Sequence, residues 1–186
     1  MGTRYLHLSI SGKSLDLCFK TITGTLSGYF LYTLSLSHPN NKVIFQNNND
    51  LEYFCANMSL SKDKCLIIPG SGVSFDYFNY TPIPKGVPLV VMISRMLIHK
   101  GVNEFVEAAR ILKKEGFKAR FVLVGSPDID NPASLNNIQI NNLATNESIE
   151  YWGWKDEIHK ILPLATIVVL PSYREGLPKI LIEASA

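Results

Sequence analysis

From residue 88 onward, short segments expected to form strands alternate with segments in which apolar residues recur at helical spacing. This alternation is typical of a parallel sheet with helices on both of its faces. The predicted strands cover residues 89–93, 121–124, 148–151 and 167–170. The predicted helices cover residues 102–112, 133–143, 158–162 and 178–184. We therefore expect the second half of the chain to be an α/β domain.

The first 80 residues are more mixed, with runs of Gly, Ser, Thr and Asn between brief apolar segments. Short strands are predicted over residues 43–46 and 66–68. The tract that begins at Asn47 predicts a turn and an N-terminal cap for a helix over residues 51–56. Prolines and glycines are frequent in residues 69–88, which we interpret as a connection between two domains.

Length, charge and hydropathy exclude several classes of protein. The 186 residues are enough for about one domain of ordinary size. The chain has 18 Lys and Arg against 16 Asp and Glu, a net charge of +2, so no basic field favours nucleic acid. No apolar run approaches the roughly 20 residues that a membrane-spanning helix needs. The N-terminus also lacks the apolar stretch of a signal peptide.

The cysteines give no indication of a metal centre. Cys18, Cys55 and Cys65 form an odd set without metal-like spacing. We therefore expect buried or free thiols, no bound metal, and a reducing compartment such as the cytoplasm.

Two cations mark the first candidate site. In a parallel α/β sheet, ligands bind beyond the carboxyl ends of the strands, near the helix N-termini. Arg95 follows the first predicted strand of this domain, and Lys100 stands at the mouth of the next helix. A guanidinium group can bind two phosphate oxygens while an ammonium group adds a point charge, so the pair suits a diphosphate. The alternative is a pair of ordinary surface cations.

A second candidate group surrounds the start of the last predicted helix. Glu175 lies in the loop before this helix, and Glu183 lies within it. A carboxylate can accept hydrogen bonds from two sugar hydroxyls. The backbone amides of Gly176 and Leu177 are placed to face an anion above the helix start. Alternatively, Glu175 stabilises the helix dipole and Glu183 forms an ion pair with Lys179.

A third candidate group is the aromatic sequence Tyr151-Trp152-Gly153-Trp154, at the end of the third predicted strand. An aromatic ring or a backbone edge there could hold a nucleobase. The alternative is that each tryptophan packs over the rim of the core.

Several of these segments occur in a fixed order along the chain. The ordered segments are Ser94-Arg95, Lys100-Gly101, 105–109, 121–125, Gly153, 170–178 and Glu183-Ala184. Together they resemble the C-terminal domain of the group 1 (family 4) retaining glycosyltransferases, over about residues 88–186. Residues 43–47 and 69–73, with Phe78, are similar to the end of that family's first domain. Ser94 departs from the family, which usually has glycine at this position.

The resemblance implies a GT-B fold, in which two Rossmann-like domains with parallel sheets bind a nucleotide-sugar, mainly through the second domain. Residues 1–80 would then be a remnant of the acceptor-side domain with its crossover. Residues 88–186 would be a truncated donor-binding domain. Both domains are therefore expected to be incomplete.

The resemblance also implies roles for individual residues. Arg95 and Lys100 would bind the donor diphosphate and stabilise the charge of the leaving group. Glu175 would be the catalytic-site residue that contacts the donor sugar near the reacting centre. The amides of Gly176 and Leu177 would support the sugar or the phosphates.

The remaining implied contacts are with the nucleoside of the donor. Glu183 would bind the ribose. The residues expected near the base are Gly125, Trp152, Gly153 and Trp154.

The implied reaction moves a hexosyl group from a UDP- or GDP-sugar to an acceptor hydroxyl, with retention of configuration and without a metal or other cofactor. The acceptor is expected to be a glycan, such as a lipid-linked one, in bacterial polysaccharide or glycoconjugate synthesis. We expect a cytoplasmic protein that associates peripherally with the inner face of the cell membrane. The alternative interpretation is a catalytically inactive nucleotide-binding or interaction module derived from such an enzyme.

Overall fold

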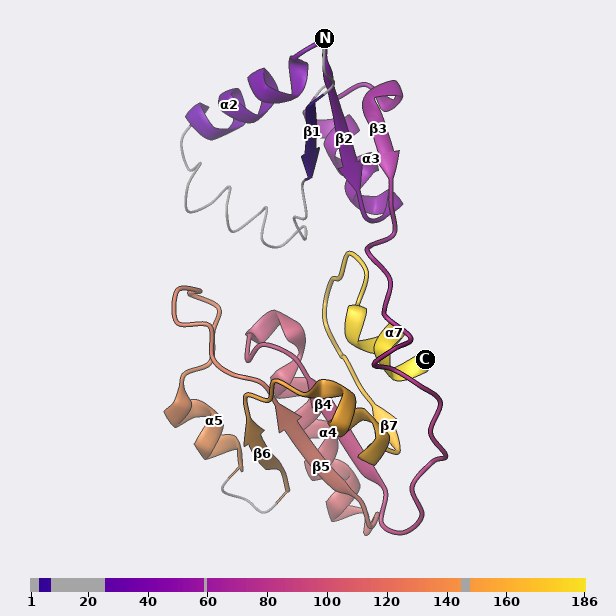
Figure 1. Cartoon of the computed structure of the whole chain (residues 1–186). Coiled ribbons are helices and arrows are strands. Elements are labelled where there is room, and N and C mark those ends of the chain that lie inside the picture. The colour runs from indigo at the N-terminus through magenta and orange to yellow at the C-terminus, as the bar shows by residue number, and fades with distance from the viewer. Residues whose placement is uncertain (1–3, 8–25, 59, 145–147) are drawn as a thin grey trace. The chain divides into compact units, whose positions relative to one another are not determined.

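The chain forms two compact units, each with its own parallel sheet, in the computed structural model (Figure 1). The structure describes residues 4–7, 26–58, 60–144 and 148–186. The first unit comprises Met1–Gly72 with Arg174–Pro178, and the second comprises Val73–Tyr173 with Lys179–Ala186. The assignment of residues 1–80 to an acceptor-side domain and of residues 88–186 to a donor-binding domain stays a prediction.

The first unit contains a small parallel sheet with strand order β1-β2-β3. Its strands are β1 (Arg4–His7), β2 (Asn41–Phe45) and β3 (Cys65–Ile67), and its helices are α2 (Leu26–Ser37) and α3 (Asn48–Asn57). Phe45 and Phe54 are fully buried, and their ring centroids are 5.4 Å apart. This contact packs α3 against the central strand, so the two short predicted strands and the helix between them are confirmed.

The N-terminus of α3 is stabilised as the sequence predicts. Asn47 is the N-cap residue, and its Oδ1 accepts a hydrogen bond of 2.8 Å from the backbone N–H of Asp50. This bond satisfies one of the N–H groups that the first turn leaves free. The helix begins at Asn48, earlier than the predicted residue 51, because the first residue of the tract, Asn47, is the one that caps it.

The second unit is built on a four-stranded parallel sheet with strand order β6-β5-β4-β7. Its strands are β4 (Leu89–Ile93), β5 (Arg120–Val124), β6 (Glu150–Gly153) and β7 (Ile167–Val168). Its α-helices are α4 (Val102–Lys114), α5 (Asn137–Ala144), α6 (Ile158–Ile161) and α7 (Lys179–Ser185). The expected alternation of strands and helices is confirmed.

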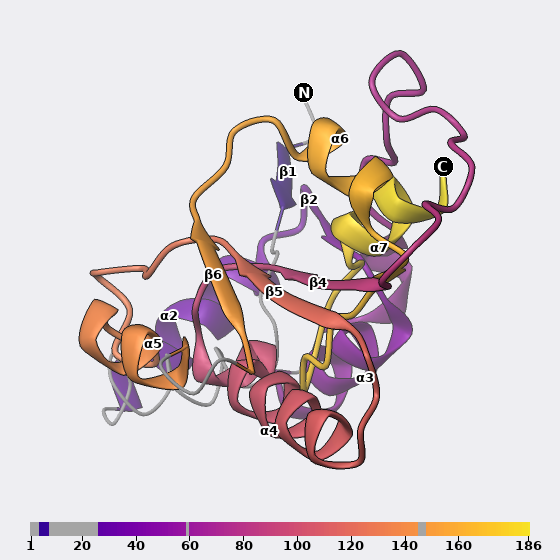
Figure 2. The same ribbon diagram turned by 90° about the horizontal axis from the view of Figure 1, so that it is seen from below.

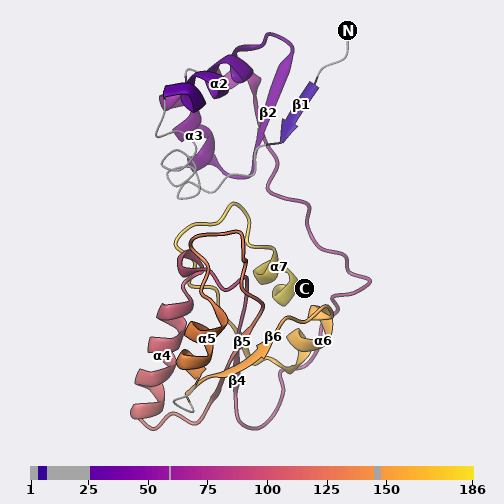
Figure 3. The ribbon, with the colours of Figure 1, turned by 90° about the vertical axis from the view of Figure 1, so that its left-hand side faces the viewer.

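Both faces of this sheet are covered, because side chains alternate between the faces along each strand. Val90 and Met92 of β4 pack with residues of α4 and α5 on one face. Leu89 and Val91 pack with Ile161 of α6 on the other. Figures 2 and 3 show α4 and α5 together on one side of the strands. The predicted α/β class, with a Rossmann-like parallel sheet, is therefore correct.

Two predicted elements differ from the structure. The helix predicted over residues 133–143 begins at Asn137, because the preceding residues pair with the loop after β4 instead. The Leu135 N–H donates to the Met96 carbonyl at 2.8 Å, and the Ile98 N–H donates to the Ala133 carbonyl at 2.9 Å. The strand predicted over residues 167–170 is only two residues long, since its pairing with β4 ends soon after Val168.

We predict that Gly125→Ala destabilises the protein strongly. Gly125 has φ +140°, and a Cβ atom there would lie 1.8 Å from the Ser94 carbonyl oxygen. The expected loss is roughly 2–4 kcal/mol in free energy of unfolding, measured by urea denaturation.

Gly116→Ala is the matched control, because Gly116 has φ +87° but no atom within 4 Å of the added Cβ. It should cost only about 1 kcal/mol. Equal losses in the two variants would contradict the close approach at Gly125.

Candidate functional site

The strand order of the second unit creates a topological switch point. The chain runs from β4 through β5 to β6 on one side, and β7 then pairs with the other side of β4. The loops that leave the carboxyl ends of β4 and β7 therefore diverge from adjacent strands. Open α/β sheets bind their ligands in the crevice that forms at such a point. This edge of the sheet is the candidate site.

The two loops at the switch point are packed against each other. The Tyr173 N–H donates to the His99 carbonyl at 3.0 Å, and the Ser172 hydroxyl donates to the same oxygen at 3.3 Å. Gly101 has φ +83°, and a Cβ atom there would lie 2.1 Å from the Pro171 carbonyl oxygen. Only glycine allows this approach, so Gly101 sets the distance between the β7 loop and the start of α4.

Arg95 lies in the loop after β4, with its side chain 57% exposed. Its Nη1 donates to the Asp128 Oδ2 at 2.7 Å, in an ion pair with the loop after β5. The sequence analysis missed Asp128. The available signal was its position three residues after Gly125, at the carboxyl end of a predicted strand.

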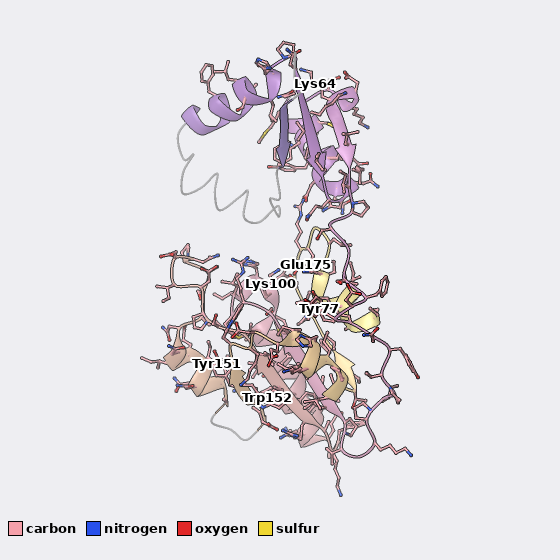
Figure 4. The ribbon with its side chains drawn as sticks, viewed as in Figure 1. Lys64, Tyr77, Lys100, Tyr151, Trp152 and Glu175 are labelled. Atoms are coloured by element: carbon pink, nitrogen blue, oxygen red, sulfur yellow. The ribbon has the colours of Figure 1, made fainter. Side chains whose placement is uncertain are left out.

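Lys100 ends the short 3₁₀ turn Ile98–Lys100 that leads into α4 (Figure 4). Its backbone N–H donates to the Leu97 carbonyl at 3.0 Å. Because this turn follows the loop that carries Arg95, both predicted cations come from the connection between β4 and α4, at the switch point.

Gly125 and Gly153 also lie at the carboxyl edge of the sheet. The Gly125 N–H donates to the Gly153 carbonyl at 2.9 Å, which joins the ends of β5 and β6. The hydroxyl of Tyr151, on β6 (Figure 4), donates to the Gly125 carbonyl at 2.8 Å. Burial raises the pKa of this Tyr151 hydroxyl. Backbone groups of both glycines therefore take part in the hydrogen bonds that hold this edge of the sheet together.

The two tryptophans are placed differently. Trp152 points back toward the amino ends of the strands, where its Nε1 donates to the Glu150 Oε2 at 3.1 Å. The Arg120 guanidinium lies 5.9 Å from the centroid of its ring. Trp154 is 62% exposed just beyond the carboxyl end of β6, and its Nε1 donates to the Asp156 Oδ1 at 2.7 Å. Of the two indoles, Trp154 is the one at the candidate edge.

Glu175, Gly176 and Leu177 group with the first unit. The neighbouring Arg174 forms an ion pair with the buried Asp50 of α3. A Cβ atom on Gly176 would lie 2.2 Å from the side-chain oxygen of Gln46. Packing against Gln46 is therefore enough to explain a glycine at this position, with or without a ligand. The Gly176 and Leu177 amides precede α7, which begins at Lys179.

Glu183 lies on α7 with its side chain only 12% exposed, and its Oε1 is 3.4 Å from the Lys179 Nζ. The ion pair that the sequence offered as the alternative is therefore present. Glu183 also lines a cavity of about 460 Å³ together with Tyr77 and His159, whose rings are 5.9 Å apart. The sequence analysis did not single out either of these two rings.

The structure thus gathers some of the predicted residues and separates others. Arg95, Lys100, Gly125, Gly153 and Trp154 come from the carboxyl edge of the second unit's sheet. The Trp152 side chain turns to the opposite end, and Glu175, Gly176 and Leu177 belong to the other compact unit. The ligand contacts of all these residues stay predictions.

The described residues contain no group of three or more His, Cys, Asp or Glu placed to hold a metal ion. Cys55 and Cys65 are free thiols with their Sγ atoms 4.0 Å apart, and burial raises the pKa of Cys65 to about 11. Cys18 lies outside the described residues. None of the described helices is both long and apolar enough to cross a membrane.

The family model for glycosyl transferases group 1 matches residues 74–186. This is more than half of the chain, and the chain belongs to that family. The matched range contains all four strands of the second unit and the switch point.

Two curated relatives are glycosyltransferases. The N,N'-diacetylbacillosaminyl-diphospho-undecaprenol alpha-1,3-N-acetylgalactosaminyltransferase of Campylobacter jejuni is 36% identical over 169 residues, 84% of this chain and 42% of that protein. The UDP-Gal:alpha-D-GlcNAc-diphosphoundecaprenol alpha-1,3-galactosyltransferase of Escherichia coli is 25% identical over 158 residues, 78% of this chain and 40% of that protein. The chain thus spans about two fifths of the length of these relatives.

Solved structures share the fold. WaaG, a glycosyltransferase involved in lipopolysaccharide biosynthesis, superimposes with a TM-score of 0.73 at 14% identity, over 98% of this chain and 54% of WaaG. HepE of Anabaena in complex with UDP-glucose gives a TM-score of 0.69 at 16% identity, over 97% of this chain and 50% of HepE. The expected GT-B type of α/β fold is confirmed.

We predict a pH-dependent contribution to stability from Glu150, at the amino end of the sheet. The Arg120 Nε and Nη2 donate to its two carboxylate oxygens, both at 2.7 Å, and these bonds lower the pKa of Glu150. A lowered carboxylate pKa stabilises the fold above the pKa of the unfolded chain, and this stabilisation disappears as pH falls through the folded pKa.

The test compares the wild-type protein with Glu150→Gln by urea unfolding. The wild-type protein should be the more stable at pH 7, and the difference should shrink between about pH 5 and pH 2. In an Arg120→Gln background the pH-dependent difference should become smaller, because only the hydrogen bond from Trp152 then lowers the pKa of Glu150. A difference that is constant across this pH range would contradict the prediction.

Proposed function

We propose that this chain binds a nucleotide-sugar at the switch point of its second unit and takes part in transferring the sugar to an acceptor hydroxyl. The observation that carries the proposal is the placement of Arg95 and Lys100 in the one loop that joins β4 to α4. Two cations at such an edge suit the diphosphate of a UDP- or GDP-sugar.

In the proposed reaction, the bond between the anomeric carbon of the sugar and the diphosphate oxygen breaks. The electron pair stays on the diphosphate, the acceptor oxygen forms the new bond to the anomeric carbon, and the proton of the acceptor hydroxyl passes to the departing diphosphate oxygen. Arg95 and Lys100 stabilise the charge that grows on the leaving diphosphate. Glu175 positions the donor sugar, and the configuration is retained. The reaction is proposed to need neither a metal nor another cofactor.

The remaining contacts with the donor follow the family pattern. Glu183 binds the ribose. To do so, its carboxylate gives up the ion pair with Lys179 and accepts hydrogen bonds from the ribose hydroxyls. The amides of Gly176 and Leu177 support the sugar or the phosphates. The base lies near Gly125, Gly153 and Trp154, whereas the side chain of Trp152 turns to the opposite end of the sheet.

The proposed acceptor is a lipid-linked glycan of bacterial polysaccharide or glycoconjugate synthesis. The names of both curated relatives specify a sugar on diphospho-undecaprenol as the acceptor. A protein acting on such a lipid would work in the cytoplasm at the inner face of the cell membrane, held there peripherally.

A second candidate is a catalytically inactive module that binds the nucleotide or another subunit. The observation that favours it is that Glu175, Gly176 and Leu177 group with the first unit, whereas Arg95 and Lys100 belong to the second. An assay of sugar transfer or hydrolysis separates the two candidates, because only an enzyme would turn over a nucleotide-sugar.

We predict that Arg95→Ala and Lys100→Ala each weaken binding of UDP or GDP about tenfold or more, as expected for loss of a charged hydrogen bond to phosphate. The measurement is isothermal titration calorimetry with both nucleotides. Lys114→Ala is the matched control, because Lys114 is an exposed lysine at the far end of α4. Equal weakening in all three variants would reject the proposed site.

A separate prediction concerns Glu175. Glu175→Gln should abolish sugar transfer and leave UDP or GDP binding within about twofold, because the proposed contact is with the sugar alone. Turnover is followed by release of the nucleoside diphosphate from a panel of UDP- and GDP-sugars. Loss of nucleotide binding in parallel with turnover would assign Glu175 a role in folding or in the phosphate site instead.

A further inference from the structure

The ion pair between Arg95 and Asp128 has a consequence for ligand binding. Arg95 donates through Nη1 to the Asp128 Oδ2 at 2.7 Å, and the two side chains are 57% and 27% exposed. The guanidinium group that is proposed to bind the diphosphate therefore already has an anionic partner within the protein. Any phosphate oxygen that takes this Nη1 group has to replace a carboxylate oxygen.

The backbone holds Asp128 opposite Arg95. The loop between β5 and α5 is joined to the loop after β4 by bonds from the Met96 N–H to the Ser126 carbonyl at 3.0 Å and from the Leu135 N–H to the Met96 carbonyl at 2.8 Å. The Asp128 N–H itself donates to the Ser134 hydroxyl at 2.9 Å. The side chain of Asp128 can therefore change without loss of the bonds that position the loop.

We propose that Asp128 is an internal counter-ion that competes with the nucleoside diphosphate for Arg95 and so limits its affinity. This inference rests on the proposed function of Arg95 as a diphosphate ligand. When the nucleotide is absent, Asp128 neutralises and orients the guanidinium group. When the nucleotide binds, the diphosphate displaces the carboxylate, and the ion pair re-forms as the product leaves.

The balance of charges favours such an exchange. An exposed ion pair is weak in water, because both groups are well hydrated and long side chains lose entropy when they are fixed. A diphosphate carries more charge than a carboxylate and can accept from two guanidinium N–H groups at once. Displacement of the Asp128 carboxylate by the diphosphate is therefore favourable. It lowers the affinity nevertheless, because the ion pair is lost and the displaced carboxylate repels the phosphates.

The inference predicts that Asp128→Asn tightens binding. The asparagine keeps the size of the side chain and removes the competing charge. The dissociation constants of UDP and GDP, measured by calorimetry, should fall about two- to fivefold, the range expected for loss of an exposed ion pair. Asp130→Asn is the matched control, because Asp130 is an exposed carboxylate in the same loop, and it should change binding less than Asp128→Asn.

A double-mutant cycle tests whether the effect passes through Arg95. In an Arg95→Ala background, Asp128→Asn should no longer change the dissociation constant beyond the effect of Asp130→Asn. If Asp128→Asn shifts the thermal unfolding midpoint, the binding test uses two other variants instead. Asp128→Ser removes the charge, and Asp128→Glu keeps it. Tighter binding with serine and wild-type binding with glutamate would support the exchange.

The outcomes separate this inference from the function on which it rests. If the wild-type protein binds UDP or GDP through Arg95 but Asp128→Asn binds equally well or more weakly, the exchange is rejected and the proposed function stands. If the wild-type protein and both asparagine variants bind neither nucleotide, the proposed donor site and the exchange are rejected together.

Discussion

The two loops that define the candidate edge lie next to each other because β4 is paired on both of its edges. β5 pairs with one edge of β4 and β7 with the other, and all three strands run in the same direction. The chain therefore leaves the sheet twice at neighbouring points, once with Arg95 and Lys100 and once with the segment that leads to Glu175. A different neighbour for β4 would separate these loops, whatever residues they carried.

The backbone of the loops at this edge has little conformational freedom. Gly101 and Gly125 lie against the carbonyl oxygens of Pro171 and Ser94, and neither position has room for a side chain. Backbone hydrogen bonds join the loops after β4, β5 and β7. A phosphate site needs cations held in a fixed geometry, and these contacts fix the peptide groups from which the cations extend.

Local patterns predicted what depends on local interactions. The residues of β4 and the amphipathic spacing of α4 are visible in the sequence, because a buried strand and a one-sided helix need those side chains. The pairing of residues 133–135 with the β4 loop was not predictable, since it depends on contacts between distant segments. The same holds for the ion pair of Arg95 with Asp128 and for the direction of Trp152, which Glu150 and Arg120 determine. The strand order, on which the site depends, is also non-local.

Gly101 and Gly125 have a practical consequence for mutagenesis of this edge of the sheet. Library members with a side chain at either position would be destabilised, because the added Cβ atom would clash with a backbone carbonyl oxygen. A focused library would keep Gly101 and Gly125 and vary exposed neighbours such as Ile129 and Trp154, which are 95% and 62% accessible. In such a library, the substitutions would fall mainly on the exposed surface at this edge of the sheet.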